Sequence, residues 1–211
     1  GGFDPMVFAD ATRLLISPGV AVSTPIIAET AARGVPIWGD IELLARLTQI
    51  PVAGITGSNG KSTVTTLLGE MAVRAGLRAL TGGNLGTPAL DFWLAEEKSS
   101  DPERIPALYV LELSSFQLET THSLNAGVAT VLNISPDHMD RYETLGDYIA
   151  AKRRIFRGDG TMVINADDPA VMAMVEPQRK VLRFTLNEPG AGEFGLRQEG
   201  GESWLGQGSE R

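Results

Sequence analysis

The chain has 211 residues, 43% of them hydrophobic, and carries a formal net charge of −8 at pH 7. This composition can build a substantial core and excludes an intrinsically disordered chain, while the negative charge argues against a general nucleic-acid binder. No apolar run approaches the roughly 18 residues of a transmembrane helix, and the absence of cysteine excludes disulfides and thiolate chemistry and fits a cytoplasmic protein.

The first 48 residues alternate between strand and helix patterns, which predicts part of an open α/β domain whose front half is missing. The expected elements are a buried strand over 13–17, a helix over 25–33, a short strand over 35–38 and a helix over 40–47. Thr24 and Pro25 are typical of a helix start, with the proline in the first turn. We place the domain boundary after residue 48.

The alternation continues over residues 49–211 and predicts a mostly parallel sheet flanked by helices. Strands are expected over 51–56, 77–80, 107–113, 127–133, 161–165 and 180–185. Helices are expected over 62–75, 87–97, 144–157 and 168–175, with polar loops over 81–86 and 99–106 and a polar tail over 198–211. Ligands of such sheets bind at the carboxyl ends of the strands.

A glycine-rich stretch between the strand over 51–56 and the helix over 62–75 is predicted to be a phosphate-binding loop. The residues expected to cradle the phosphates are Gly57, Ser58, Asn59, Gly60, Lys61, Ser62 and Thr63. Backbone N–H groups converge there, Lys61 supplies a full charge, and the Ser62 hydroxyl is placed to ligate Mg²⁺. The usual pattern has glycine where this chain has Ile55, so the loop is a variant; the alternative is a glycine-rich turn with an incidental lysine.

Glu112 interrupts the otherwise apolar strand over 107–113. A carboxylate in a buried strand is costly unless it is paired or bound to a metal. The alternatives are an edge position or an ion pair with an arginine. We favour a Mg²⁺ ligand beside Ser62, as acidic residues serve in other phosphate-loop proteins.

The loop after the strand over 127–133 concentrates charged groups. His138 lies between Asp137 and Asp140, and Arg141 follows directly. A lone histidine is usually a surface residue. A histidine flanked by carboxylates, immediately after a buried strand of a nucleotide-binding sheet, favours a functional role.

Two further polar residues have open interpretations. Lys152 belongs to a basic run that could be a solvated helix face, yet it lies three residues from both Ile149 and Ile155 and could face inward with them. Asn84 lies in the loop over 81–86, where it is either a turn residue or a ligand contact.

Seven segments together resemble the Mur ligases of bacterial cell-wall synthesis. They are residues 39–43, 55–63, 82–86, 111–119, 137–142, 151–152 and 165–168. The resemblance covers nearly the whole chain and is closest to the branch that adds D-glutamate to UDP-N-acetylmuramoyl-L-alanine (UDP-MurNAc-L-alanine). Ser62 after the loop lysine separates the chain from folylpolyglutamate synthases, which tend to carry glycine there.

The resemblance implies an ATP-dependent amide ligase of peptidoglycan precursor synthesis. In that family ATP phosphorylates the substrate carboxylate, and the amine of the incoming amino acid attacks the acyl phosphate. Carried over by position, the implied catalytic residues are Lys61, Glu112, His138 and Lys152, and the implied ligands of two Mg²⁺ ions are Ser62, Glu112, His138 and Lys152. The implied substrate contacts are Gly19, Asn84, His138 and Arg141. Lys152 is implied to be carbamylated by CO₂, which turns an ammonium into an anionic metal ligand.

The family has three domains, and the resemblance implies how this chain divides among them. Residues 1–48 would be the C-terminal part of a uridine-nucleotide-binding Rossmann-like domain, and residues 49–211 a central ATP-binding domain without its C-terminal part. The C-terminal ligase domain would be absent. We therefore expect a cytoplasmic, monomeric protein, without nucleic-acid or membrane partners, that is inactive in isolation.

Three alternatives stay open. One is a Mur-type or folylpolyglutamate-type ligase that adds a different amino acid. Another is a phosphate-loop NTPase switch that binds a macromolecule and forms no amide, which leaves the Asp137–His138 loop and Lys152 without a role. The third is a folded fragment that binds nucleotide weakly and does nothing else.

Overall fold

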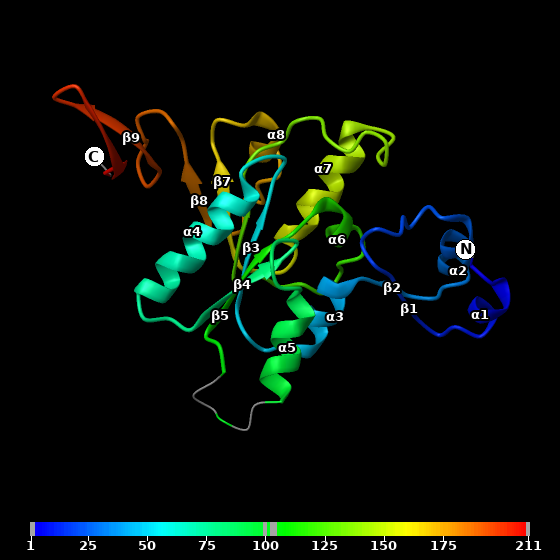
Figure 1. Ribbon diagram of the computed structural model, residues 1–211. Coiled ribbons are helices and arrows are strands. Elements are labelled where there is room, and N and C mark those ends of the chain that lie inside the picture. Colours follow the sequence, from blue (N-terminus) through cyan, green and yellow to red (C-terminus); the bar gives the residue numbers. More distant parts are fainter. Residues whose placement is uncertain (1–2, 99–100, 102–104, 210–211) are drawn as a thin grey trace.

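A computed structural model describes residues 3–98, 101 and 105–209. An eight-stranded sheet with the order β10-β9-β8-β7-β6-β3-β5-β4 forms its centre (Figure 1). The strands are β3 (Val52–Thr56), β4 (Ala79–Gly83), β5 (Leu108–Glu112), β6 (Val128–Val131), β7 (Thr161–Asn165), β8 (Val181–Phe184), β9 (Phe194–Glu199) and β10 (Glu202–Gln207). All pair in parallel except β10, which runs antiparallel to β9. The predicted α/β class with a mostly parallel sheet is confirmed.

Helices cover the sheet unequally. They are α4 (Lys61–Arg74), α5 (Ala89–Glu97), α6 (Ser115–Glu119), α7 (Leu145–Arg153) with the 3₁₀ turn Arg154–Phe156, and α8 (Pro169–Met172). The chain passes from β3 outward to β4 through α4 and then reverses direction along the sheet. Because crossovers between parallel strands are right-handed, α5 to α8 lie on the face opposite α4.

Two apolar clusters confirm this division. The larger cluster lies under α5, α6 and α8 and includes Tyr109, Leu111 and Met162 from the strands. The smaller one lies under α4 and includes Ile55 and Val110. Tyr109, Val110 and Leu111 alternate between the two clusters, as side chains of one strand must.

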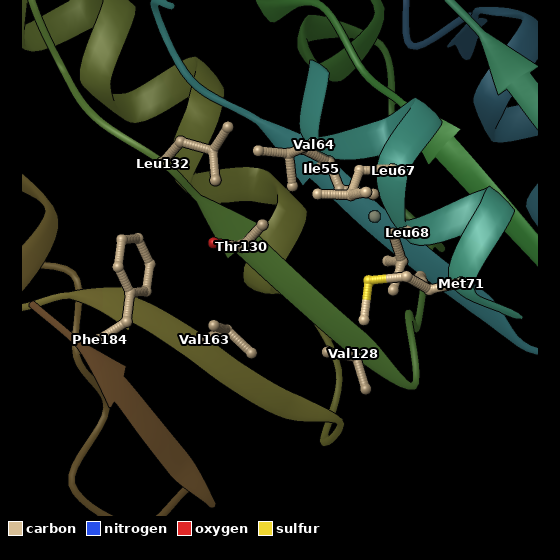
Figure 2. Close-up of a pocket in the computed structure, with 12 residues that line it drawn as sticks. Ile55, Val64, Leu67, Leu68, Met71, Val128, Thr130, Leu132, Val163 and Phe184 are labelled. Carbon is tan, nitrogen blue, oxygen red and sulfur yellow. The ribbon is translucent and has the colours of Figure 1, made fainter. Parts of the chain in front are cut away.

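The α4 face stays open over part of the sheet. A groove of about 430 Å³ runs between α4 and strands β6, β7 and β8, and Figure 2 shows apolar side chains pointing into it from both sides. Leu67 and Met71 of α4 line it, and each side chain is 58% exposed.

The N-terminal residues lie beside the sheet (Figure 1). They form α1 (Pro5–Ala9), β1 (Leu14–Leu15), α2 (Pro25–Ala32), β2 (Ile37–Trp38) and α3 (Asp40–Leu47), with β1 and β2 paired in parallel. In α3, Ile41 and Leu44 are buried in the larger apolar cluster of the main sheet. This helix therefore packs with the central unit.

A buried carboxylate attaches α3 to that unit. Glu42 accepts hydrogen bonds from the backbone N–H groups of His122 and Ser123 at 2.6 and 2.8 Å and from the Ser123 hydroxyl at 2.6 Å. Arg46 adds a bond of 2.6 Å from its own helix. Burial opposes ionisation of Glu42, but these hydrogen bonds, led by the Ser123 hydroxyl, outweigh it and lower its pKa.

Several predicted elements need correction. The strand over 13–17 is only two residues long and is not buried, since Leu15 is 60% exposed. The strand over 77–80 is shifted to Ala79–Gly83, because Gly82 and Gly83 pair with β5 instead of forming a loop. Residues 198–207 belong to the β9–β10 hairpin and are not a tail. Most of the polar loop expected over 99–106 lies outside the described residues.

Two helices among the described residues were not predicted. α1 begins with Asp4, whose side chain accepts a hydrogen bond from the Met6 N–H, and with a proline in its first turn. α6 begins with a capping box in which Ser114 and Gln117 exchange side-chain and backbone hydrogen bonds. Both patterns are legible in a sequence. Among the described residues, no helix is both long enough and apolar enough to cross a membrane.

Candidate functional site

The phosphate loop follows β3 directly and ends where α4 begins at Lys61. Gly57 and Gly60 have φ angles of 151° and 78°, in the region that only glycine adopts readily. A Cβ at Gly57 would also approach the Leu132 backbone nitrogen to 3.2 Å. The two glycines therefore allow the tight turn that aims the start of α4 at a ligand.

The loop after β6 braces the phosphate loop. Ser58 donates from its N–H to the Asn133 carbonyl at 3.0 Å, and its hydroxyl exchanges bonds of 2.9 Å with the Ser135 backbone. The Tyr148 hydroxyl lies 3.0 Å from the same Ser58 oxygen, and the Asn59 N–H donates to the Asn133 side chain at 2.8 Å. These hydrogen bonds fix the phosphate loop against the loop after β6.

A carboxylate and a hydroxyl meet beside the loop. The Ser62 hydroxyl donates to Glu112 Oε2 at 2.7 Å, and Asn84 Nδ2 donates to Glu112 Oε1 at 2.7 Å. Glu112 is only 3% exposed. The three residues come together because β4, β5 and β3 are adjacent and parallel, so their carboxyl ends share one edge of the sheet. Hydroxyl and carboxylate oxygens are the hard ligands that Mg²⁺ prefers, so this donor set fits that ion.

Two lysines share one carbonyl. Lys61 Nζ donates to the Gly57 and Ser58 carbonyl oxygens at 3.0 Å each, and Lys152 Nζ donates to the Gly57 oxygen at 2.8 Å. The whole Lys152 side chain is buried, with its nitrogen 4.7 Å above the Tyr148 ring. Burial, and then the like charge of Lys61, lower the pKa of Lys152 to about 7. The inward orientation considered for Lys152 is the one observed.

His138 stands in a different set of contacts. It has a φ of 54°, its side chain is half exposed, and its ring centroid lies 4.8 Å from that of Phe116. Its Nε2 atom is 3.5 Å from the Asp137 carboxylate. In the described part of the chain, no group of three or more histidine, aspartate or glutamate side chains could hold a metal ion. The structure therefore brings Ser62 into contact with Glu112 and brings Lys61 and Lys152 to the same carbonyl oxygen. His138 contacts Phe116 instead.

The remaining predicted residues are Arg141 and Gly19. The Arg141 guanidinium binds the Glu119 carboxylate at 2.7 and 3.2 Å and the carbonyl oxygen of Pro18 at 3.1 Å. Arg141 therefore contacts the turn that contains Gly19. Two of the four substrate contacts expected from the sequence, Arg141 and Gly19, thus belong to one group of residues.

Sequence reasoning missed the residues that brace the loop, namely Asn133, Ser135 and Tyr148, and it also missed Thr56. Tyr148 precedes Lys152 by four residues, so the two share a helix face, and this spacing could have indicated it. Thr56 contacts Lys152 at 3.3 Å across the fold. Such a contact has no local pattern in the sequence.

Comparisons with known proteins show which family the chain belongs to. The Mur ligase middle domain model matches residues 55–203. The chain is 58% identical over its full length to the UDP-N-acetylmuramoylalanine–D-glutamate ligase of Nitrosococcus oceani, and 50% identical over 97% of its length to that of Methylococcus capsulatus. It covers only 45% and 43% of those two relatives. The chain therefore spans less than half the length of these curated relatives.

Solved structures share the fold at lower identity. A UDP-N-acetylmuramate:L-alanyl-gamma-D-glutamyl-meso-diaminopimelate ligase from Neisseria meningitides aligns with a TM-score of 0.59 at 18% identity, over 96% of this chain and 69% of that one. A pseudomurein peptide ligase type C from Methanothermus fervidus aligns with a TM-score of 0.53 at 21% identity, over 94% and 39%. At these identities the likeness supports the fold alone. The family model, which matches well over half of the residues, and the 58% identity show that the chain belongs to the Mur ligase family.

Proposed function

We propose that this chain is the central, ATP-binding part of a ligase that joins D-glutamate to UDP-MurNAc-L-alanine in peptidoglycan precursor synthesis. The observation that carries the proposal is the 58% identity over all 211 residues to a relative that bears the name of this ligase. Since the chain spans 45% of that relative, the activity belongs to a longer polypeptide. The remaining parts would supply most of the D-glutamate site, so this chain alone is expected to be inactive.

The geometry suits transfer of a phosphoryl group. Mur ligases in general depend on ATP and Mg²⁺. The γ-phosphate and the substrate carboxylate are both anions, so their reaction requires positioning and charge screening. Lys61 lies on the phosphate loop, and Ser62 and Glu112 would hold a Mg²⁺ ion whose charge screens the phosphates. Asn84 fixes the second oxygen of Glu112, which orients the carboxylate toward Ser62.

We propose that Lys152 provides a second anionic group after carbamylation. Only the neutral amine attacks CO₂: a nitrogen–carbon bond forms, one carbon–oxygen π bond breaks, one proton is released to solvent, and a carbamate anion results. Burial lowers the pKa of Lys152 to about 7, so much of the amine is neutral near physiological pH. The carbamate oxygens, together with His138, are the proposed ligands of a second Mg²⁺ ion.

Three of the predicted residues are proposed to contact the UDP-linked substrate. Asn84 and His138 would touch the muramoyl substrate, and the turn at Gly19 would lie near its uridine nucleotide. We propose that the reaction takes place in the cytoplasm and that the enzyme is a monomer. α3 packs across the predicted division between residues 1–48 and 49–211.

The test is the choice of acceptor by the full-length enzyme that contains this chain. With UDP-MurNAc-L-alanine, ATP and Mg²⁺, phosphate release is expected to require D-glutamate and to yield the amide product. Dependence on meso-diaminopimelate or L-lysine would assign the chain to another ligase of the family. Nucleotide-dependent binding of a macromolecule without amide formation would support a switch protein.

A further inference from the structure

Arg141 is committed to contacts within the protein. Its Nε and Nη2 atoms donate to the two oxygens of Glu119 at 3.2 and 2.7 Å, a two-point pairing. Its Nη1 atom donates to the carbonyl oxygen of Pro18, which lies 123 positions earlier in the chain, at 3.1 Å. The side chains of Arg141 and Glu119 are only 13% and 16% exposed. The guanidinium therefore has little capacity left for a ligand.

The same guanidinium also stacks on an aromatic ring. Arg141 Cζ lies 4.1 Å from the centroid of Phe116, and the Phe116 centroid lies 4.8 Å from that of His138. Phe116 and Glu119 are three residues apart on α6 and therefore lie on one side of that helix. One short helix thus supplies the carboxylate that holds Arg141 and the ring that contacts both Arg141 and His138.

The backbone at His138 needs such support. His138 has a φ of 54°, an uncommon conformation for a residue with a side chain. Its carbonyl oxygen accepts hydrogen bonds from the N–H groups of Arg141 and Tyr142 at 2.9 and 3.2 Å. A strained conformation of this kind persists only where the surrounding contacts define it. Arg141 contributes through its backbone and, by way of Phe116, through its side chain.

We infer that Arg141 is a positioning residue and not a substrate contact. Together with Glu119 it holds the turn at Pro18 and Gly19 and the loop at His138 in a fixed relation, so that both face one UDP-linked substrate. The inference rests on the proposed function, which places that substrate between the two segments. It replaces the substrate contact expected of Arg141 from the sequence.

The two possible roles of Arg141 predict different effects of neutralising Glu119. If Arg141 bound the substrate directly, neutralising Glu119 would leave the guanidinium free and substrate binding intact. If Arg141 positions the two segments, Glu119→Gln acts like the loss of Arg141, because the guanidinium loses its anchor. Glu119 and Arg141 then act as one unit, and the effects of the two substitutions on the KM do not add.

The experiment uses the full-length enzyme with Glu119→Gln, Arg141→Met and the double variant. Each single variant is expected to raise the KM for the UDP-linked substrate about tenfold or more, and the double variant by no more than Arg141→Met. The KM for ATP is expected to stay within about twofold of wild type, because other residues brace the phosphate loop. Arg153→Met, which removes the exposed partner of a 3.6 Å ion pair with Glu176, is the control and is expected to change neither constant.

Three outcomes would overturn the inference: a wild-type KM in Glu119→Gln with a raised KM in Arg141→Met, wild-type values in both, or equal rises in the KM for ATP. Hydrogen exchange in this 211-residue chain gives a second test that needs no turnover. Arg141→Lys should speed exchange over both 17–20 and 138–142, and unchanged exchange in either segment contradicts the inference. If the wild-type enzyme uses another acceptor, the proposed function fails, while the coupling of Glu119 and Arg141 remains measurable by exchange.

Discussion

Lys152 places a basic nitrogen where water does not reach it. Its Nζ atom donates to the Gly57 carbonyl and lies 3.3 Å from the Thr56 hydroxyl. Neither neutral oxygen replaces a counter-ion, and the charge of Lys61 nearby opposes protonation. The fold therefore holds a lysine whose charged form is disfavoured, which is the condition that carbamylation requires.

This condition predicts a pH dependence of stability. The pKa of Lys152 falls from 10.5, taken for the unfolded chain, to about 7 in the folded chain. Between these values the unfolded state binds more protons, so stability rises with pH and is lowest below about 7. Relative to Lys152→Met, the free energy of unfolding of wild type should rise by up to about 1.4 kcal/mol per pH unit over this range. Urea unfolding of both chains in CO₂-free buffer at several pH values measures it.

A constant difference between the two chains across that range would contradict the lowered pKa. Lys180→Met is a matched control, because Lys180 is exposed on the surface of the molecule. It should leave the slope of wild type unchanged.

The site residues that could be predicted from the sequence are those that stand out from the local pattern of their neighbours. Glu112 stands out because it interrupts an apolar strand, and Lys61 and Ser62 because they follow a glycine-rich turn. Asn133 and Ser135 have no such mark. Their role depends on β6 lying beside β3, and the register of two strands that are 72 residues or more apart is a tertiary property.

Elements with strong local patterns were predicted well, and short or edge elements were not. The strand over 161–165 matches the structure residue for residue, and the helix predicted to start at Asp40 ends at Leu47 as expected, although Gly39 is its N-cap and not Asp40. The end of β9 and all of β10 were taken for a tail, because these residues are polar and mostly exposed and their apolar alternation is weak. β4 was placed too early because glycines rarely indicate a strand, although Gly82 pairs closely with β5.

The helix α3 bears on where the domains divide. Its residues Ile41 and Leu44 are 0% and 1% exposed and belong to the apolar cluster of the main sheet. Gln117 of α6 also donates to Asp40 at the start of α3 at 2.8 Å. We therefore propose that the central unit begins before α3, near Gly39, and not after residue 48.

Truncation tests this boundary. A chain of residues 39–211 should unfold cooperatively, whereas residues 49–211 should lose several kcal/mol or fail to fold, since burying Ile41 and Leu44 is worth about 2–5 kcal/mol each. Thermal and urea unfolding followed by circular dichroism measure both. Equal stability of the two truncated chains would return the boundary to residue 48.

The order in which the chain forms the strands leaves part of one sheet face, the face that carries α4, without a covering helix. All crossovers after β4 lie opposite α4, so the strands β6, β7 and β8 present apolar side chains beside that helix. Val128 is 43% exposed there, and Leu67 and Met71 are 58% exposed (Figure 2). Parallel sheets are ordinarily covered on both faces. The uncovered part of this sheet therefore exposes apolar side chains that similar sheets bury.

The exposed face predicts dye binding and self-association of the 211-residue chain. Leu67→Lys with Met71→Lys should lower the fluorescence of a bound naphthalene sulfonate dye and reduce association in sedimentation experiments. Stability should change by less than about 1 kcal/mol, because both side chains are already largely exposed. Leu94→Lys on α5, 42% exposed on the other face, is the control. An equal loss of dye fluorescence in Leu94→Lys would contradict the assignment to this groove.

The most direct test of the account is Mg²⁺-dependent nucleotide binding at the Ser62–Glu112 pair. Titration calorimetry of the full-length enzyme with a non-hydrolysable ATP analogue would compare wild type with Glu112→Gln, and with Glu199→Gln on β9 as a control. We predict that Mg²⁺ tightens binding to wild type and to the control, and that Glu112→Gln loses about tenfold of the affinity in Mg²⁺ but little in EDTA. Wild-type affinity of Glu112→Gln in Mg²⁺ would contradict the site.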